Sequence, residues 1–536
     1  MNLEPQTANF TPLTPIDFIQ RSADIFPDKV AIVDGVDRIT YAQFLSRTRR
    51  LAGALRERGI ARGDVVSMLS PNNLEMLEAH FGVPMAGAVL NALNTRLDAE
   101  GMAAILAHAE SRLLIVHSSL LRLAIDAVDK LGRHLPLLIT GHPDSIQKGS
   151  HELYDSALES AGELSERPAS EWDTISLNYT SGTTGNPKGV VYSHRGAYLN
   201  SLGNMITFGL QPSSVYLWTL PMFHCNGWSF PWALTAIGGR HVCLSKVDPG
   251  EILRLIAEER VTHLCAAPVV LTMLIEEGAG RHKGFDHGIV EIATGGAAPP
   301  SSVIENTEKM GFRVTHLYGL TESYGPATSC MRKEEWADLP LTEQSRLMAR
   351  QGVRNITMSE QKVLSSGLPV PQDGSTIGEL VLRGNTIMKG YYKAERETDE
   401  ALEGGWLHTG DLAVVHSDGY VEIKDRAKDV IISGGENISS LEVEEVLHRH
   451  PNIAEAAVVA APHEKWGETP VAFVRLRESS APVDGAQIIE FCRSNLARFK
   501  CPTAVIIGDI PKTPTGKVEK FALRARAAAE AQGAGG

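Results

Sequence analysis

The order of apolar and polar residues near the start of the chain predicts one amphipathic helix followed by one buried strand. Residues 40–59 carry apolar side chains at helical spacing, begin with a capping box formed by Thr40 and Gln43, and end at Gly59. The mainly apolar run Val65–Leu69 comes next and has the length of a strand. A helix paired with a short buried strand is the unit from which layered α/β proteins are built.

The same alternation continues along the first half of the chain. Short apolar runs at residues 113–116, 137–139, 175–179 and 263–267 predict further strands, and residues 249–259 predict a helix. Strands separated by helices favour layered sheets with largely parallel strands.

The pattern changes twice in the second half. Residues 331–362 are polar and rich in charge, with helical stretches at 334–337 and 342–350, and are interpreted as an insertion on the surface. Short strands bounded by turn residues then predict a β-rich subdomain over residues 375–423. After residue 428 helices and strands alternate again, in a new α+β series.

The expected fold class is therefore α/β with two domains. A large N-terminal domain, residues 1–427, contains the layered sheets and the β-rich subdomain, and a small α+β domain follows at residues 428–536. A chain of 536 residues exceeds what one hydrophobic core serves. The expected C-terminal elements are helices at 441–450 and 486–496 and strands at 456–459, 471–476 and 504–507.

Composition narrows the class of protein. A hydrophobic content of 43% with 21% charged residues is typical of a globular enzyme, and the formal charge of −13 argues against a nucleic-acid partner, which needs a concentrated basic surface. The cysteines form no CxxC pair, so neither a zinc site nor a dithiol motif is expected, and scattered thiols favour a reducing compartment. They are Cys225, Cys243, Cys265, Cys330, Cys492 and Cys501.

The sequence predicts a cytoplasmic protein without a transmembrane segment. The start, MNLEPQTANF, lacks the basic and apolar parts of a signal peptide, and the end carries no peroxisomal Ser-Lys-Leu. The most apolar stretch, residues 81–93, is interrupted by Gly, Pro and Asn.

The most informative segment is YTSGTTGNPKGV, which predicts a binding site for a polyphosphate. Ser181, Thr183 and Thr184 supply hydroxyl donors beside glycines whose backbone N–H groups can turn toward an anion, and Lys188 adds a positive charge. The alternative is a plain surface turn, which a match of twelve residues disfavours. The Gly-Lys-Ser/Thr ending of a Walker A loop is missing, so ATP is the expected ligand by a route different from that of P-loop NTPases.

The segment YGLTES adds candidates for the same ligand. Glu322 can hold Mg²⁺, a hard cation that favours carboxylate and phosphate oxygens. Thr321 can donate to a phosphate, and Tyr318 can stack on a base. Taken alone, the segment also fits a simple turn at the end of a strand.

Three segments further along carry charged residues that are also typical of plain loops. Asp411, in GWLHTGDL, can accept both hydroxyls of a ribose, although an Asx-turn is the plainer interpretation. Asp425-Arg426-Ala427-Lys428 and the lysine of PKTPTGK, Lys517, each also fit a solvated loop.

Together these segments resemble the adenylate-forming superfamily of acyl-CoA synthetases, non-ribosomal adenylation domains and beetle luciferases. The order and spacing of YTSGTTGNPKG, YGLTES, GWLHTGD, DRAKD and PTGK carry the resemblance, which runs from about residue 15 to about residue 525. PMFHCNGW, SGGENIS and the long insertion are similar to the acyl-CoA ligase branch, which includes plant-type acyl-activating enzymes, medium-chain acyl-CoA ligases and methylmercaptopropionate-CoA ligases.

The resemblance implies two half-reactions. A carboxylate attacks the α-phosphate of Mg·ATP to give an acyl-adenylate and pyrophosphate, and the thiol of coenzyme A then displaces AMP. Positioning and charge neutralisation supply most of the catalysis of the first step. A homodimer is the habit of the family.

The resemblance also assigns each matching position a role. The β- and γ-phosphates are cradled by Ser181, Thr183, Thr184 and Lys188, while Thr321 contacts the α-phosphate and Glu322 holds Mg²⁺. Adenine is enclosed by Tyr318 and the backbone of Gly295, Gly296, Ala297 and Ala298. The ribose is held by Asp411 and Arg426. Lys517 bridges the α-phosphate and the substrate carboxylate, the small domain is a mobile lid that rotates about Lys428, and the backbone of Gly434 and Gly435 lines a tunnel for coenzyme A.

The acid itself is less well defined by the sequence. The expected acyl-pocket residues are His224, Trp228 and Gly295, and His224 is also a catalytic candidate. The alternatives are that His224 is a packed histidine in a loop and that Trp228 simply fills the core. PMFHCNGW has no carboxylate to grip an amino group and no basic residue other than His224. A short-to-medium aliphatic or methylthio-alkanoic acid is therefore favoured, with an aryl acid such as benzoate or cinnamate second.

Two other classes share every adenylation motif. A stand-alone adenylation protein would load a carrier protein through the same tunnel, and a luciferase-like oxidase would consume O₂. A nucleotide-binding module without catalysis would have no need for Lys428 and Lys517 together.

Overall fold

The first large sheet has eight strands, of which the central ones are parallel. The computed structural model describes residue 4 and residues 6–141, 152–180, 188–278, 284–463, 465–477, 483–513 and 517–533. In spatial order the strands of this sheet are β20 (Gly390–Tyr391), β9 (Gly189–Ser193), β8 (Thr174–Tyr179), β4 (Val89–Ala92), β3 (Val65–Leu69), β5 (Leu113–His117), β6 (Leu137–Thr140) and β7 (Glu152–Leu153).

The second large sheet has nine strands and follows the same design, with antiparallel strands only at its two ends. Its order is β16 (Val353–Arg354), β15 (Gly325–Ser329), β14 (Phe312–Leu320), β13 (Val290–Thr294), β12 (His263–Ala266), β10 (Val215–Leu217), β11 (Arg240–Val242), β1 (Val30–Asp34) and β2 (Asp37–Thr40).

Helices separate the strands, as the alternating pattern predicts. The predicted capping box is present, because the side chain of Thr40 accepts from the N–H of Gln43 and the side chain of Gln43 accepts in return. The helices up to residue 348 are α1 (Ile16–Ile25), α2 (Tyr41–Glu57), α3 (Leu74–Met85), α4 (Ala99–His108), α5 (Leu121–Leu131), α6 (Tyr154–Ser160), α7 (His194–Thr207), α8 (Cys225–Trp228), α9 (Phe230–Ala236), α10 (Pro249–Glu258), α11 (Pro268–Gly278), α12 (Ser301–Glu308) and α13 (Leu341–Met348). Along the whole described chain, single 3₁₀ turns occur at Ser118–Leu120, Thr321–Ser323, Glu334–Trp336, Glu403–Gly405 and Arg498–Lys500.

The predicted β-rich region is a separate antiparallel sheet of five strands. It consists of β18 (Leu368–Pro369), β17 (Glu360–Ser365), β19 (Gly378–Arg383), β21 (Leu407–Val415) and β22 (Val421–Arg426), with α14 (Glu395–Ala401) in the connection between β20 and β21.

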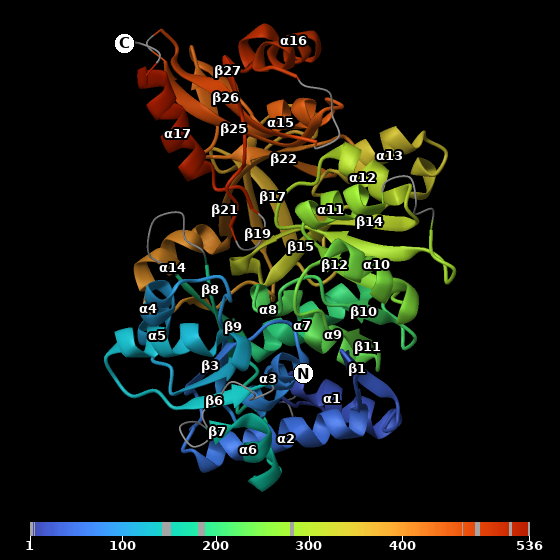
Figure 1. Ribbon diagram of the computed structural model, residues 1–536, viewed down its shortest axis with the longest axis vertical. Helices are drawn as coiled ribbons and strands as arrows, with labels where there is room; N and C mark the ends of the chain where they lie inside the picture. Colours follow the sequence, from blue (N-terminus) through green and yellow to red (C-terminus); the bar gives the residue numbers. More distant parts are fainter. Residues whose placement is uncertain are drawn as a thin grey trace.

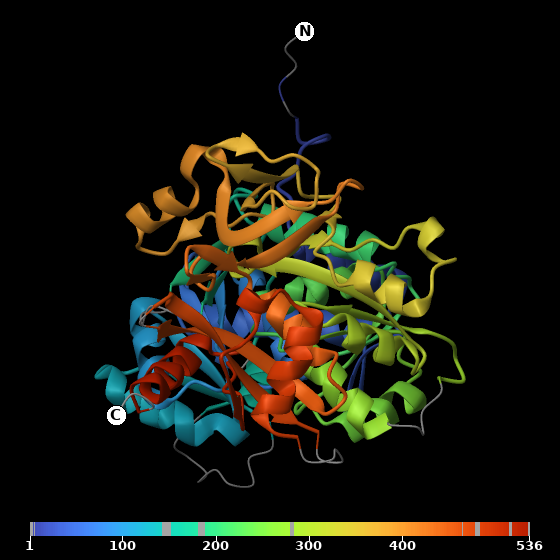
Figure 2. The same ribbon diagram turned by 90° about the horizontal axis from the view of Figure 1, so that it is seen from above.

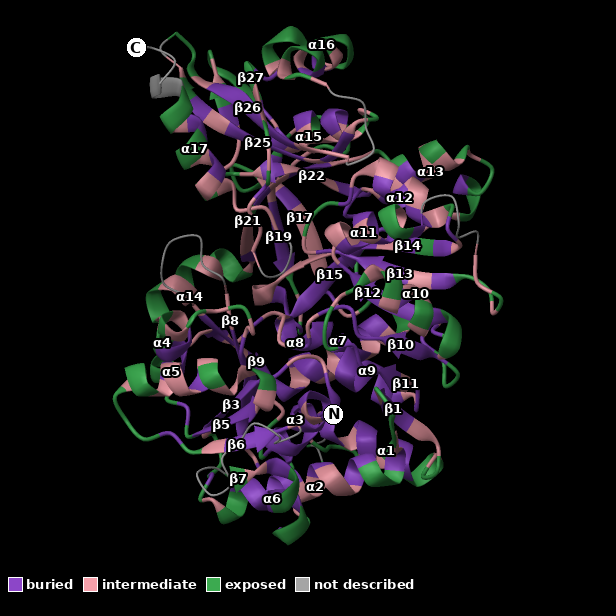
Figure 3. Cartoon of the chain, viewed as in Figure 1, coloured by how far each residue is buried: buried purple, intermediate pink, exposed green. Residues whose placement is uncertain are grey.

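The C-terminal elements form a five-stranded sheet with three helices. They are β23 (Ile431–Ser433), β24 (Glu436–Ile438), β25 (Ile453–His463), β26 (Gly467–Leu476), β27 (Ala504–Ile507), α15 (Ser440–His448), α16 (Gly485–Asn495) and α17 (Lys520–Gly533). They lie at one end of the long axis (Figure 1), and the view along that axis places them over the region between the two large sheets (Figure 2). Burial is densest along the strands of the large sheets (Figure 3).

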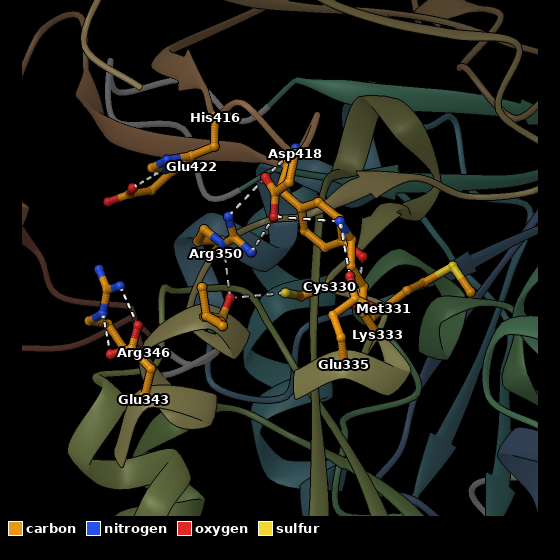
Figure 4. A network of polar contacts seen from close by, with 12 residues as sticks. Cys330, Met331, Lys333, Glu335, Glu343, Arg346, Arg350, His416, Asp418 and Glu422 are labelled. Atoms are coloured by element: carbon orange, nitrogen blue, oxygen red, sulfur yellow. Dashed lines mark hydrogen bonds and ion pairs between the residues drawn. The ribbon is translucent and has the colours of Figure 1, made fainter. Parts of the chain in front are cut away.

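The insertion at residues 331–362, predicted to lie on the surface, is anchored to the rest of the large domain by specific contacts. The guanidinium of Arg350 makes two hydrogen bonds of 3.1 Å to the carboxylate of Asp418 (Figure 4). The same guanidinium lies over the rings of Trp336 and Tyr420. Trp336 and Met348 are buried in one small apolar cluster with Ile304 of α12 and Val314 of β14, so this segment packs against the large domain. The paired strands β21 and β22, which the insertion contacts through Asp418 and Tyr420, also carry Asp411 and Arg426.

Candidate active site

The site lies where two neighbouring parallel strands of the nine-stranded sheet end. Strand β13 ends at Thr294, immediately before Gly295 and Gly296, and strand β14 runs through Tyr318 to Leu320. Ligands of α/β proteins bind at this edge, beyond the carboxyl ends of the strands. The topology thus brings two of the predicted segments together although they are about twenty residues apart in sequence.

Tyr318, Asp411 and Arg426 form the first cluster at this edge. The hydroxyl of Tyr318 donates to Oδ2 of Asp411 at 2.6 Å, and Nε of Arg426 lies 3.1 Å from Oδ1 of the same carboxylate. Asp411 is only 3% exposed, and it pairs with Arg426 across strands β21 and β22. Burial and the carboxylate of Asp411 hold the pKa of Tyr318 well above its usual range, so the phenol remains a donor.

Glu322, Tyr391 and Lys188 form the second cluster. The hydroxyl of Tyr391 donates to Oε1 of Glu322 at 2.7 Å, and the ammonium of Lys188 lies 4.7 Å from the centre of the Tyr391 ring. Tyr391 lies on β20, which pairs with β9 next to Lys188. The other predicted cradle residues, Ser181, Thr183 and Thr184, lie outside the described residues.

Sequence reasoning did not single out Tyr391. No motif contained it, and only the pairing of β20 with β9, across about two hundred residues of chain, reveals its place beside Glu322.

The geometry around Glu322 fits Mg²⁺ held by a single carboxylate. Among the residues that the structure describes, no group of three or more His, Cys, Asp and Glu side chains is arranged to hold a metal ion. Mg²⁺ keeps several waters and is commonly bound by one or two carboxylates together with substrate phosphates. Glu322, whose carboxylate accepts from Tyr391 just beyond the end of β14, offers one such carboxylate.

Lys517 reaches this site from the C-terminal domain. A small cavity is lined by His224, Cys225, Trp228, Gly296, Leu317, Tyr318, Gly319, Leu320, Thr321, Gly325, Pro326 and Lys517. The Cε atom of Lys517 is 3.9 Å from the position that a Cβ would take on Gly296, so the glycine leaves room for the lysine. The structure therefore places the predicted catalytic residues Lys517, Thr321 and His224 around one cavity.

Burial sets the charge states in this cavity. Burial, with a smaller contribution from Arg426, lowers the pKa of Lys517, while Cys225, Asp411 and Glu322 act in the opposite direction. Burial, assisted by Lys517, lowers the pKa of His224 to about 3. His224 is therefore neutral at physiological pH, which leaves Lys517 as the residue of the cavity lining that can carry a positive charge.

On the other side of the cavity the backbone forms a left-handed helical turn. Five successive residues, Cys225, Asn226, Gly227, Trp228 and Ser229, have φ between 42° and 62°. For residues with a side chain such a turn costs roughly 1–2 kcal/mol each, so it persists only where its surroundings hold it. The carbonyl of Trp228 accepts from the side-chain amide of Asn204 on α7 at 2.7 Å.

The turn presents the indole of Trp228 between two glycines. A Cβ on Gly295 would lie 2.9 Å from Cη2 of Trp228, and a Cβ on Gly325 would lie 3.0 Å from its Cδ1. The sequence predicted that the absence of a side chain at Gly295 leaves room for an acyl group. In the structure the indole occupies that side of Gly295, and Trp228 is both buried and part of the cavity wall.

Two side-chain amides that the sequence analysis did not single out, the half-buried Asn72 and the buried Asn178, hold the loop before this turn. The side-chain amide of Asn72 donates to the carbonyls of Trp218 and Leu220, and its oxygen accepts from the N–H of Met222. Asn178 donates to the carbonyl of Phe223 at 2.8 Å. No motif marks these residues, since asparagine is common in loops and their partners are distant in sequence.

The predicted hinge and tunnel residues lie elsewhere. Lys428, Gly434 and Gly435 are exposed, and none of them is among the residues that line the cavity around Lys517. Gly434 and Gly435 have φ of 60° and 87° at the turn between β23 and β24, a conformation that favours glycine. Near the hinge the carboxylate of Asp425 accepts from the N–H of Ser440 at 2.6 Å, which ties the end of β22 to α15.

Comparisons with known proteins identify the family. The model of the AMP-binding enzyme family matches residues 19–392, and that of the AMP-binding enzyme C-terminal domain matches residues 442–517. An acetate/butyrate–CoA ligase of Arabidopsis thaliana, named as peroxisomal, is 46% identical over 97% of this chain and 95% of its own. A 2-methylpropanoate–CoA ligase of Humulus lupulus is 46% identical over 98% and 96% of the two chains.

Solved structures agree on the fold. ATP-bound MatB from Rhodopseudomonas palustris superposes with a TM-score of 0.81 at 28% identity, over 95% of this chain and 98% of the other. The anthranilate–CoA ligase AuaEII in complex with anthranoyl-AMP gives a TM-score of 0.87 at 24% identity, over 98% and 100% of the two chains.

The chain therefore belongs to the AMP-binding enzyme family, and the resemblance to adenylate-forming enzymes is confirmed. The prediction of an AMP-forming acid–thiol ligase, an acyl-CoA synthetase, is confirmed at the level of this class, because relatives that match over nearly the whole chain are named CoA ligases. Within the described residues no helix is long and apolar enough to cross a membrane.

Proposed function

We propose that this enzyme activates a short aliphatic carboxylic acid, of about two to four carbons, with ATP and transfers the acyl group to coenzyme A. The position of Trp228 carries the proposal. Its indole, fixed between Gly295 and Gly325, forms part of the wall of the cavity that Lys517 also lines, and it would limit the depth left for an acyl chain. The acetate, butyrate and 2-methylpropanoate in the names of the relatives are acids of this size.

The nucleotide side supports the first half-reaction. Asp411, aligned by Tyr318 and Arg426, is suited to accept the two ribose hydroxyls. Glu322 would hold Mg²⁺, which would neutralise phosphate charge when bound. Lys188 and Thr321 lie within reach of a polyphosphate bound along the same edge.

Lys517 would stabilise the charge that develops as the acid attacks the α-phosphate. The ammonium of Lys517 would act inside a cavity, where fixed charges act more strongly than in water. His224, neutral and next to Lys517, would shape the wall where the acid's carboxylate lies.

The second half-reaction requires a different arrangement of the small domain. Lys517 occupies the cavity here, whereas Gly434 and Gly435, with no side chains to obstruct a pantetheine arm, are exposed at another surface. A rotation about the exposed Lys428 would exchange the two surfaces. Domain closure of this kind is a common device for separating two steps of one reaction.

The test is AMP release with coenzyme A across straight-chain acids from acetate to octanoate, with 3-methylthiopropanoate, benzoate and cinnamate included. We expect kcat/KM to peak at two to four carbons. It should fall about tenfold or more for each further carbon that the indole of Trp228, the floor of the acyl pocket, excludes. Trp228→Ala should move the peak to longer acids. Trp172→Ala, at a tryptophan that is 53% exposed and outside the cavity, is the matched control.

If Trp228→Ala left the order of acids unchanged, Trp228 would not be the floor and the short-chain assignment would lose its basis. If kcat/KM were highest for benzoate or cinnamate, the hypothesis of an aryl-acid substrate would be favoured instead. Product with a phosphopantetheinylated carrier but none with free coenzyme A would favour a stand-alone adenylation protein.

A cytoplasmic location and a homodimer remain predictions. The Arabidopsis relative is named as peroxisomal, so imaging of a tagged full-length protein must decide between the two compartments. Light scattering of the purified protein would determine the number of subunits.

A further inference from the structure

We propose that Asn204 and Asn200 on helix α7 are specificity-determining positioning residues, because their side-chain amides hold the left-handed turn that places Trp228 at the floor of the acyl pocket. The proposal deepens the proposed function and rests on it. Neither asparagine lines the cavity, so each would act through Trp228 and not by touching the acid.

Asn204 holds the turn at the tryptophan itself. Its Nδ2 donates to the carbonyl of Trp228 at 2.7 Å, and the residue is only 2% exposed. A side-chain amide offers two donors in a fixed plane without a charge, which suits a buried site. A backbone carbonyl that is buried without a partner costs free energy, and this donor satisfies the carbonyl of the buried Trp228.

Asn200 joins the same turn to a second left-handed segment. Its Nδ2 donates to Oγ of Ser229 at 2.9 Å and to the carbonyl of Tyr324 at 2.7 Å. Tyr324 has φ of 63° and precedes Gly325, the glycine that faces the Trp228 ring. One side chain thus fixes the distance between the turn that carries the indole and the backbone that covers it.

The two asparagines act from one face of one helix. They are four residues apart on α7, so both amides point to the same side, where α8 and β15 lie close to the helix (Figure 1). The middle of the turn is held from another helix. Nε2 of His80 on α3 lies 3.4 Å from Nδ2 of Asn226, while Nδ1 of His80 lies 2.7 Å from the carbonyl of Met76.

That arrangement fixes the tautomer of His80. Burial lowers its pKa to about 4, so the ring is neutral, and Nδ1 donates to Met76 while Nε2 accepts from Asn226. The turn is therefore held at Asn226 by α3 and at Trp228 and Ser229 by α7.

The decisive variant is Asn204→Leu, which keeps a similar volume and removes the donor. We expect the KM for acetate to rise about tenfold, the KM for ATP to stay within about twofold, and the ratio of kcat/KM for hexanoate to that for acetate to rise about tenfold. Asn200→Ala should act in the same direction. Asn204→Asp, which keeps the shape of the side chain but loses the donor, replaces the leucine variant if that protein does not fold.

Asn91→Leu is the matched control. Asn91 is a fully buried asparagine on β4 whose amide donates to Ser67 at 2.9 Å and which does not contact the turn. Its substitution should lower stability and leave the order of acids unchanged, as a purely structural effect would.

A double-mutant cycle separates this proposal from the one on which it rests. In a Trp228→Ala background, Asn204→Leu should no longer change the ratio of acids, because the two substitutions act through one element. If Trp228→Ala broadens the acid range but Asn204→Leu and Asn204→Asp do not, the positioning role is wrong and the short-chain assignment stands. If Trp228→Ala itself changes nothing, both proposals fall.

Discussion

The two parts of the site that we propose to bind the nucleotide and the acid, called the nucleotide side and the acid side, are built in different ways. On the nucleotide side, Tyr318, Asp411 and Arg426 lie on strands, and Asp411 contacts the other two directly, at 2.6 and 3.1 Å. On the acid side, Trp228 is placed by five residues of left-handed backbone that buried amides hold from outside. The nucleotide is the same for every reaction of the family, whereas the acid is what distinguishes one member from another.

The difference suggests where specificity can change most easily. A side chain on a strand has its position fixed by the sheet, so its identity alone decides what it binds. A turn that is strained on its own depends on each of its supports, and a change in any support moves the side chain that it carries. The comparison predicts that variants of the nucleotide side change rates for all acids alike, and that variants of the acid side change the order of acids.

The largest effect is expected for Lys517→Ala. Loss of the cation in the cavity should slow acyl-adenylate formation by about 10³-fold, while thioester formation from pre-made acyl-adenylate continues. Pyrophosphate release and single-turnover transfer to coenzyme A measure the two steps separately. Lys512→Ala, at a nearby lysine paired with Glu455, is the control. Equal loss of both half-reactions would remove Lys517 from its assigned role.

Asp411→Asn should have the next largest effect. The amide keeps the size of the side chain but loses a carboxylate that accepts from Tyr318 and pairs with Arg426, so the KM for ATP should rise about 10- to 100-fold. The order of acids should stay the same. Asp373→Asn, in an exposed turn, is the control. A changed order of acids would show that the two sides are not independent.

Arg350→Met tests a region that belongs to neither side. The loss of two hydrogen bonds to Asp418 should lower the free energy of unfolding by about 2 kcal/mol, measured by urea denaturation. KM values for ATP and acid should stay unchanged, because the insertion anchors the sheet without touching the cavity. A rise in the KM for ATP alone would mean that the anchor positions Asp411 and Arg426 as well.

The smallest effect concerns pH. The rate of adenylation should fall as pH rises through the pKa of Lys517, which burial and Arg426 place below its ordinary value of 10.5. Arg426→Gln removes a neighbouring positive charge, so the ammonium form is favoured and the alkaline limb should move to higher pH. The profile is measured with saturating ATP. A limb that stayed in place, or moved to lower pH, would mean that another group titrates.

Much of the nucleotide side could be predicted from the sequence, because its residues lie in contiguous motifs whose chemistry is local. The segment around Lys188, the run from Tyr318 to Glu322 and the loop of Asp411 each combine the right residue types within a few positions. The described residues of these segments lie in the two clusters around Asp411 and Glu322. Tyr391 escaped prediction because its link to Glu322 passes through strand pairing and not through a motif.

The acid side could be located in the sequence but not interpreted. PMFHCNGW identified His224 and Trp228, yet nothing in those letters indicates a left-handed turn of which four residues are not glycine. Intrinsic preference opposes that conformation, so only partners that are distant in sequence could impose it. Asn204 precedes Trp228 by about two dozen residues and offers no signal of its own.

The sequence by itself therefore determined the family, and it predicted the two half-reactions and most of the groups proposed to contact ATP, since these depend on residue types at short spacing. Only the tertiary structure decided that the indole of Trp228 occupies the space beside Gly295, that Lys517 shares a cavity with His224 and Thr321, and that α7 supports the acid side. The physical reason is that these features depend on where separate elements pack. A backbone conformation that is unfavourable in isolation is stable only when that packing supplies the hydrogen bonds that it lacks.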